Sequence, residues 1–290
     1  MSRLKDALEA GEFVITGEVA PPHGTDYSAM LTSVRTLGPY CHAINITDNQ
    51  GATLHLSSLA ASRATLEAGY EPIFQQTCRD RNRLALQSDL LAAWTLGIEN
   101  VLVVTGDDPR GGDHVQAQGV FDLDSTQLLA VAREVNGGTD INGKALDGAT
   151  GFYLGAAMFP EAEPWEIALE RTVEKVEAGA RFFQTQAVTD IAKFARAAEA
   201  LEPYGAKLVA SVLLLKNPRV IDFVNNRLAG LMIPEEAASR IKGAADPLAE
   251  AVALATETVR ELRGLAHGVH IMPLGADEAA VQVLERAGCV

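Results

Sequence analysis

The sequence predicts an α/β fold, a (β/α)8 TIM barrel that forms a single domain over residues 1–290. Short apolar segments recur along the chain about every 30–40 residues, and a helix-forming segment follows each of them. Strands that alternate with helices in this way run parallel and connect through right-handed crossovers. Eight such units in a chain of 290 residues are typical of a barrel.

The predicted strands are apolar runs that end at turn residues. The clearest one, Asn100–Val104, contains four consecutive apolar residues and stops at Thr105-Gly106-Asp107-Asp108-Pro109. An apolar run without alternation is typical of a parallel strand that is buried on both faces. The predicted strands cover residues 13–19, 43–47, 72–77, 100–104, 151–157, 181–186, 207–215 and 268–272.

The helices are predicted from their capping residues and their polarity. Thr25 or Asp26 can cap the helix that follows the first strand, and Gly69, Gly97 and Gly179 follow helices as C-terminal caps do. A loop rich in glycine and aspartate separates the fourth strand from its helix. The predicted helices cover residues 1–10, 27–37, 56–68, 82–96, 125–136, 164–178, 189–201, 218–226, 234–241, 246–264 and 276–287.

A doubly wound open sheet is the alternative fold. It is not supported by either phosphate-binding fingerprint, because no GxGxxG follows a predicted strand and no GxxxxGK[ST] occurs. The net charge of −14 argues against a nucleic-acid partner, since phosphate binding requires a basic surface.

Composition also indicates the cellular compartment of the protein and whether it contains disulfides or a metal site. The three cysteines are widely spaced and form no CxxC pair, so neither a disulfide framework nor a zinc site is indicated. The apolar runs are shorter than the roughly 18 residues of a membrane span, and the N-terminal segment does not resemble a signal peptide. We therefore expect a cytoplasmic protein with no membrane partner and no metal.

In a barrel, the residues at the carboxyl ends of the strands line one mouth, and catalytic residues lie there. We find neither a Cys–His pair nor a Ser-His-Asp arrangement among them. The residues predicted at the mouth are Glu18, Thr47, Asp48, Gln75 or Gln76, Asp107, Phe159, Gln186, Lys216 and Met272.

Four of these residues are candidates for chemistry, and each has a structural alternative. Glu18 is an acid in an apolar strand and could serve as general acid, or it could pair with a basic residue. Asp107 could be a functional carboxylate or a turn residue that caps its own backbone. Gln186 could bind the amide edge of a heterocycle or cap a loop. Phe159 could stack on a ligand or only pack against neighbouring residues.

Six motifs follow one another between residues 18 and 186. They are Glu18 before Pro21-Pro22, Thr47-Asp48-Asn49-Gln50, Gln76-Thr77-Cys78, Gly106-Asp107, Lys175-Val176-Glu177-Ala178-Gly179-Ala180 and Thr185-Gln186. Their order and spacing resemble the methylenetetrahydrofolate reductase family. The segments 115–129 and 268–272 resemble the branch of that family found in acetogenic and related bacteria.

The resemblance implies a barrel that holds a flavin, FAD first and FMN as the alternative, with NAD(P)H as electron donor. The implied reaction is hydride transfer to 5,10-methylenetetrahydrofolate, which gives 5-methyltetrahydrofolate. Glu18 corresponds to the general acid that opens the five-membered ring, and Asp107 to the carboxylate that stabilises the resulting 5-iminium cation. The implied substrate contacts are Gln186, Asp107 and Phe159. The implied flavin contacts are Thr47, Asp48, Gln75, Thr105, Gly106 and Lys175.

Four positions depart from the family pattern. Thr105 replaces an arginine, Gln75 a histidine, Phe159 a tyrosine and Ala168 an acidic residue. The departures at Thr105, Gln75 and Ala168 alter contacts to the flavin, so direct hydride transfer from NAD(P)H without a flavin stays open.

Two other functions also stay open. One is a methyltransferase linked to folate and a corrinoid, and the other is a non-catalytic, folate-binding barrel that serves as a subunit of a redox complex. A homo-oligomer and an electron-donating partner subunit are the partner alternatives.

Overall fold

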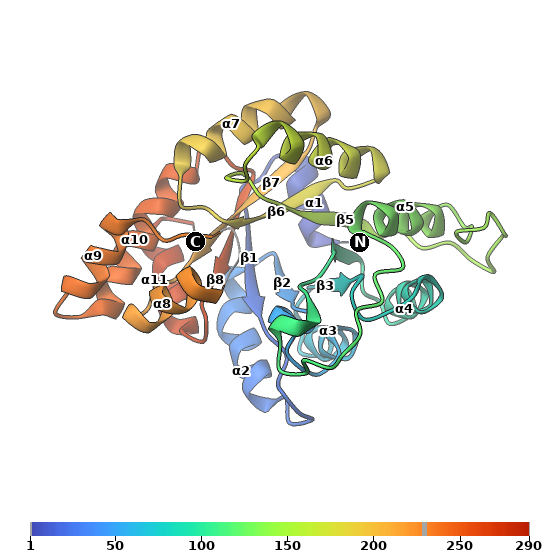
Figure 1. Ribbon diagram of the computed structural model, residues 1–290, viewed down its shortest axis with the longest axis horizontal. Helices are drawn as coiled ribbons and strands as arrows, with labels where there is room; N and C mark the ends of the chain where they lie inside the picture. Colours follow the sequence, from blue (N-terminus) through green and yellow to red (C-terminus); the bar gives the residue numbers. More distant parts are fainter. Residues whose placement is uncertain (1, 228–230, 290) are drawn as a thin grey trace.

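The computed structural model describes residues 2–227 and 231–289, which form a closed barrel of parallel strands (Figure 1). The strands follow one another in chain order, and the barrel closes where β1 pairs with β8 through Val14 and Gly268. The predicted fold class is therefore confirmed. The strands are β1 (Val14–Val19), β2 (Ala43–Ile46), β3 (Pro72–Thr77), β4 (Asn100–Val104), β5 (Tyr153–Met158), β6 (Phe182–Ala187), β7 (Lys207–Leu213) and β8 (Gly268–Met272).

Helices surround the barrel, and helix α1 comes before the first strand in the chain. The α-helices are α1 (Arg3–Ala10), α2 (Ser28–Leu37), α3 (Ser58–Glu67), α4 (Arg83–Thr95), α5 (Ser125–Asn136), α6 (Trp165–Ala178), α7 (Ile191–Leu201), α8 (Pro218–Arg227), α9 (Glu235–Gly243), α10 (Pro247–Leu262) and α11 (Asp277–Arg286). Short 3-10 helices are η1 (Gly38–Tyr40), η2 (Gln50–Ala52), η3 (Pro109–Gly111) and η4 (Glu202–Tyr204). None of the helices within the described ranges is both long and apolar enough to cross a membrane.

The predicted element bounds agree with the structure to within a few residues. One such difference is at the fifth strand, where β5 begins at Tyr153 and not at Gly151. The side chain of Asn136, at the end of α5, accepts hydrogen bonds from the backbone N–H of Phe152 and the hydroxyl of Thr150. These bonds hold the segment before Tyr153 against the helix, so the strand starts later than its apolar run.

The amino end of the barrel is closed by α1. Leu4 and Leu8 of this helix are fully buried, and burial of a leucine side chain stabilises by about 1.5–3 kcal/mol. The side chain of Ser2 caps α1 and also donates to the side chains of Glu71 and Asn100. The buried strand residues of this cluster are Val14, Ala43, Ile73, Leu102, Tyr153, Phe182 and Val209.

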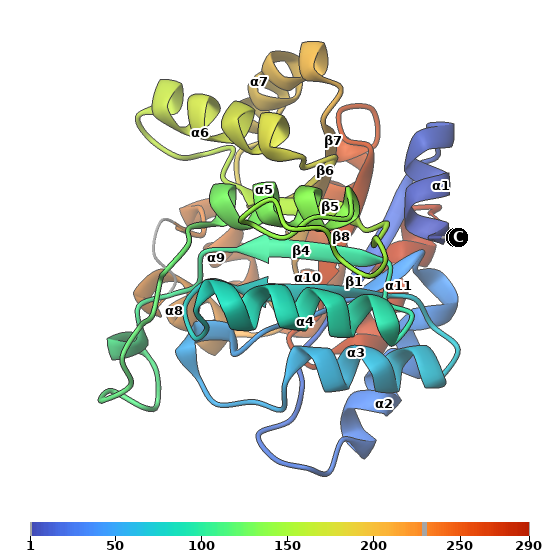
Figure 2. The ribbon, with the colours of Figure 1, turned by 90° about the vertical axis from the view of Figure 1, so that its right-hand side faces the viewer.

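The opposite end of the barrel is the mouth. In Figure 2 the arrow of β4 points toward the long loop that joins it to α5, while α1 lies at the other end of the barrel. Helices α8 and α9, inserted between β7 and α10, lie at the mouth end in the same view. The carboxyl ends of the strands therefore face the loops that carry the candidate residues.

Candidate active site

Glu18 and Asp107 are brought together by η2, which follows β2. The Nε2 atom of Gln50 donates to Oε1 of Glu18 at 3.4 Å, and the backbone N–H of Gly51 donates to Oδ2 of Asp107 at 3.2 Å. The side chain of Glu18 is only 9% exposed, whereas Asp107 is exposed at the mouth. Two carboxylates from β1 and the β4 loop thus flank one short loop, one of them sheltered and one open to solvent.

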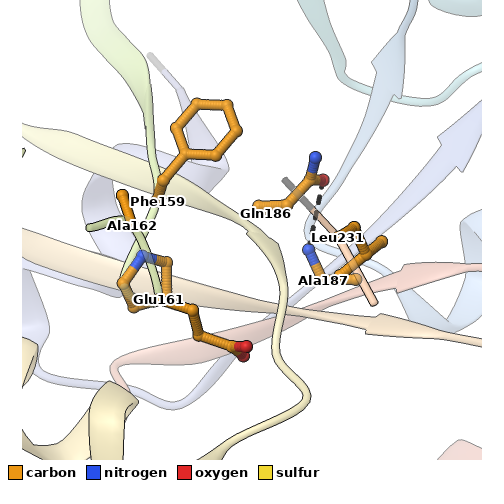
Figure 3. A pocket seen from close by; sticks show the side chains of 7 residues that line it. Phe159, Glu161, Ala162, Gln186, Ala187 and Leu231 are labelled. Atoms are coloured by element: carbon orange, nitrogen blue, oxygen red, sulfur yellow. Dashed lines mark hydrogen bonds between the residues drawn. The ribbon is translucent and has the colours of Figure 1, made fainter. Parts of the chain in front are cut away.

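Gln186 and Phe159 line a small pocket of about 60 Å³ between the ends of β5 and β6. In Figure 3 the ring of Phe159 and the amide of Gln186 point to one side, and the carboxylate of Glu161 extends away from them. Oε1 of Gln186 accepts from the backbone N–H of Ala187 at 3.2 Å, which orients the amide. Phe159 is 44% exposed, so its ring offers a face to a ligand rather than to the core.

Asp48 lies at the predicted position, but its carboxylate is turned into the protein. It is 1% exposed and accepts from the backbone N–H and the hydroxyl of Thr77, both at 3.0 Å. Arg81 donates to the same carboxylate at 2.9 Å and pairs with Asp89 as well. These contacts engage Oδ2 of Asp48 within the protein and favour a structural role, while its role as a flavin contact stays a prediction.

Beside Gly106, the buried Arg79 forms a second ion pair, with the more exposed Asp80. The Arg79 side chain is 2% exposed and donates to both carboxylate oxygens of Asp80 at 2.7 Å. Burial alone would raise the pKa of Asp80, but the contacts with Arg79 outweigh it and hold this pKa below the ordinary 3.8. Gly106 has a φ of +93°, and a Cβ atom at this position would lie 2.9 Å from Cβ of Arg79. The turn after β4 therefore approaches Arg79 as closely as glycine permits.

Three more of the predicted flavin-contacting residues form hydrogen bonds with other groups of the protein. Nζ of Lys175 donates to the carbonyl of Ala157 at 2.8 Å, and burial lowers the pKa of this lysine. The hydroxyl of Thr105 donates to Oγ of Ser125 at 3.1 Å. Oε1 of Gln75 accepts from the backbone N–H of the residue after Thr47 at 3.1 Å.

Thr47 differs from these residues. Its side chain is 1% exposed, and its hydroxyl has no hydrogen-bond partner among the residues that the structure describes. Gln76, the alternative to Gln75 at the mouth, is fully buried and donates to the carbonyl of Leu86 in α4. Gln75 is thus the β3 glutamine that faces the barrel.

The remaining mouth residues have supporting positions. Nζ of Lys216 donates to the carbonyl of Leu274, which ties the end of β7 to the loop after β8. Met272 ends β8 and is partly buried. A larger groove of about 340 Å³ lies outside the mouth, between β7, α9 and α10, and none of the predicted site residues line it.

No group of three or more histidine, cysteine, aspartate or glutamate side chains suited to a metal ion occurs within residues 2–227 and 231–289. The thiols of Cys41 and Cys78 are buried, and burial raises the pKa of each to about 12. Neither thiol can therefore act as a nucleophile near neutral pH.

Sequence reasoning missed a set of polar residues inside the barrel below the mouth. Thr16, Asn45 and His270 are all buried, and Nδ1 of His270 lies 2.9 Å from Oγ1 of Thr16. A signal for them exists, because Thr16 and Glu18 alternate along β1 with apolar residues, as inward-facing residues of a strand do. Arg79 and Arg81 were also missed, since nothing in their local sequence marks an arginine as buried.

Solved structures share this fold at low sequence identity. A 2,3-dimethylmalate lyase of the PEP mutase/isocitrate lyase superfamily aligns with a TM-score of 0.55 and 13% identity, over 98% of this chain and 85% of that one. A tryptophan synthase from M. tuberculosis aligns with a TM-score of 0.57 and 12% identity over the full length of both chains. These likenesses concern the barrel fold alone.

Sequence comparisons are more specific. The family model described as methylenetetrahydrofolate reductase matches residues 3–288. Methylenetetrahydrofolate reductase 2 of Schizosaccharomyces pombe is 21% identical over 98% of this chain and 47% of its own length. Methylenetetrahydrofolate reductase (NADH) 1 of Arabidopsis thaliana is 25% identical over 100% of this chain and 51% of its own length. The chain thus spans about half the length of the curated relatives it matches.

Proposed function

The chain belongs to the methylenetetrahydrofolate reductase family, and on that premise we propose that it reduces 5,10-methylenetetrahydrofolate to 5-methyltetrahydrofolate. The observation that carries the proposal is the pair of carboxylates at the mouth, with sheltered Glu18 and exposed Asp107 held on either side of Gln50 and Gly51. Acid catalysis and cation stabilisation require two carboxylates in different environments. We also infer that the barrel is the catalytic domain.

In the proposed mechanism, Glu18 donates its proton to the amine nitrogen N10 of the five-membered ring. The bond from that nitrogen to the methylene carbon then breaks, and a cationic 5-iminium group forms on the other nitrogen. The carboxylate of Asp107 stabilises this cation, and a hydride added to the methylene carbon completes the methyl group. Gln186 binds the amide edge of the pterin through its donor and its acceptor, and Phe159 covers the ring.

The family resemblance implies a flavin that carries the hydride, but the residues present here fit a flavin poorly. Of the six predicted contacts, Asp48, Gln75, Thr105 and Lys175 each have a polar side-chain atom that is hydrogen-bonded to another group of the protein. No step of the proposed mechanism therefore passes through a flavin. The proposed hydride donor is reduced nicotinamide, NADH or NADPH, acting directly on the folate.

A flavin-mediated route with FAD or FMN is the second candidate. It is favoured by the buried hydroxyl of Thr47, which has no partner among the described residues and could bind a cofactor atom. An absorbance spectrum of the purified protein between about 300 and 550 nm, before and after addition of FAD or FMN, separates the two routes. Flavin bands would support the second candidate, and a colourless protein that remains active would support direct transfer.

Replacement of Glu18 by glutamine tests the proposed general acid. We expect turnover of 5,10-methylenetetrahydrofolate to fall by about 10²–10⁴-fold, because a positioned acid contributes on that order. Binding of NADH, measured by fluorescence quenching, should not change. Glu236→Gln, at an exposed position of α9, is the matched control and should retain the wild-type rate. Near-normal turnover in Glu18→Gln would remove Glu18 from the mechanism.

A further inference from the structure

His270 lies inside the barrel directly beneath Glu18. The imidazole is fully buried, and its Nε2 atom lies 3.5 Å from Oε2 of Glu18. Its Nδ1 atom lies 2.9 Å from Oγ1 of Thr16, on the strand that also carries Glu18. Nε2 makes no hydrogen bond with any residue in the described part of the chain. Nε2 therefore faces a carboxylate at a distance too long for a good hydrogen bond. A buried polar atom without a hydrogen bond requires an explanation, and here we look for it in function.

The contacts of His270 with Thr16 and Glu18 together favour one tautomer of the imidazole. A neutral imidazole carries its proton on one nitrogen and a lone pair on the other. A lone pair on Nε2 would face the lone pairs on Oε2 of Glu18, which is unfavourable when Oε1 carries the proton as well as when it does not. If the Thr16 hydroxyl donates to Nδ1, the proton resides on Nε2 and points at Oε2. The partner of one ring nitrogen thus decides what the other nitrogen offers.

The two oxygens of Glu18 consequently have different surroundings. Oε2 faces the buried His270, whereas Oε1 lies 3.4 Å from Nε2 of Gln50, an exposed residue at the mouth. Only Oε1 is on the side from which a substrate can approach. An oxygen held by an inner donor keeps the carboxyl group from rotating and leaves the other oxygen free for proton transfer.

We propose that His270, with its tautomer set by Thr16, is a positioning residue that holds Oε2 of Glu18 and presents the proton on Oε1 to the substrate. This inference rests on the proposed reductase function. The proton passes from Oε1 to ring nitrogen N10, which keeps the electron pair of the bond that breaks. Glu18 becomes a carboxylate and regains its proton from solvent, and His270 neither gains nor loses a proton.

The tautomer is tested directly by nuclear magnetic resonance of protein labelled with ¹⁵N-histidine. We expect the nitrogen shifts of His270 to report a proton on Nε2 and a hydrogen-bonded lone pair on Nδ1. Thr16→Val removes the hydroxyl at constant volume and should shift this equilibrium. Thr256→Val, which removes a buried hydroxyl from α10, should leave the His270 signals unchanged. A proton on Nδ1 in the wild type would overturn the inference.

A pair of substitutions at His270 tests the consequence for turnover. The amide nitrogen of glutamine can take the place of Nε2, whereas the shorter asparagine places its amide near Nδ1, out of reach of Glu18. We expect His270→Gln to keep kcat within about fivefold of wild type and His270→Asn to lower it by about 100-fold, with KM for folate little changed. Equal losses in both variants would reduce His270 to a packing residue and refute the inference.

The two measurements separate this inference from the proposed function. If the wild type does not reduce 5,10-methylenetetrahydrofolate, the proposed function fails, and the histidine spectra still decide whether Thr16 sets the tautomer toward Glu18. In that protein, Glu18→Gln should move the Nε2–H resonance of His270 if the contact exists. An unmoved resonance would reject the contact irrespective of any activity.

Discussion

Replacing Asp48 by alanine is expected to destabilise the barrel by about 3 kcal/mol. The carboxylate is 1% exposed and accepts three short hydrogen bonds, two from Thr77 and one from Arg81. Removing one partner of a buried ion pair costs about 3–5 kcal/mol. The lower end applies because Arg81 is 19% exposed and keeps its contact with Asp89.

Thermal unfolding monitored by circular dichroism measures this loss. For a domain of this size, about 3 kcal/mol corresponds to a decrease in Tm of roughly 6 °C. Glu67→Ala is the matched control, since Glu67 is 61% exposed and pairs with Arg63 on the surface of α3. The control should have the same Tm as the wild type, because exposed ion pairs contribute little to the free energy of unfolding.

The opposite result would refute this assignment of Asp48. If Asp48→Ala melts within about 1 °C of wild type and instead loses affinity for a cofactor, the carboxylate binds a ligand. The cofactor contact predicted from the sequence would then be right, and the buried pair with Arg81 would contribute little to stability.

Two further predictions concern the turn at Arg79. Gly106→Ala should lower the free energy of unfolding by about 2 kcal/mol, because the position combines a φ of +93° with a Cβ contact of 2.9 Å. The control Gly11→Ala, with a φ of +78° and no atom within 4 Å, should lose less stability in the same unfolding assay. Since the folded-state pKa of Asp80 lies below 3.8, its pairing stabilises the fold above that pH and is lost as the pH falls through the lowered value. The stability difference between wild type and Asp80→Asn, measured by urea unfolding, should therefore shrink on acidification; a constant difference would contradict the assigned pair.

Alternation of strands and helices was sufficient to predict the barrel and its mouth. Glu18 and Asp107 were found because a barrel brings the ends of all its strands to one side. Contacts between residues distant in sequence could not be predicted in this way. The pairing of Asp48 with Arg81 depends on how the loops after β2 and β3 fold together, and no local pattern encodes it.

The sequence does not reveal which side chains find partners inside the protein. Thr47 and Asp48 both follow β2 and are 1% exposed, yet the carboxylate of Asp48 accepts from Thr77 and Arg81, whereas the hydroxyl of Thr47 has no partner among the described residues. Their assignment to the cofactor stays a prediction. His270 was given no role because its strand is apolar on both sides of it, and a single polar residue in such a run does not indicate its partner.

The fate of the hydride tests the central claim most directly. The protein is incubated with 5,10-methylenetetrahydrofolate and NADH deuterated on either face of C4, and the methyl group of the product is analysed by mass spectrometry. Direct transfer predicts one deuterium per methyl group from one of the two labelled donors. Hydrogen carried by a flavin nitrogen exchanges with water, so a methyl group that acquires its hydrogen from solvent with both donors would contradict the account.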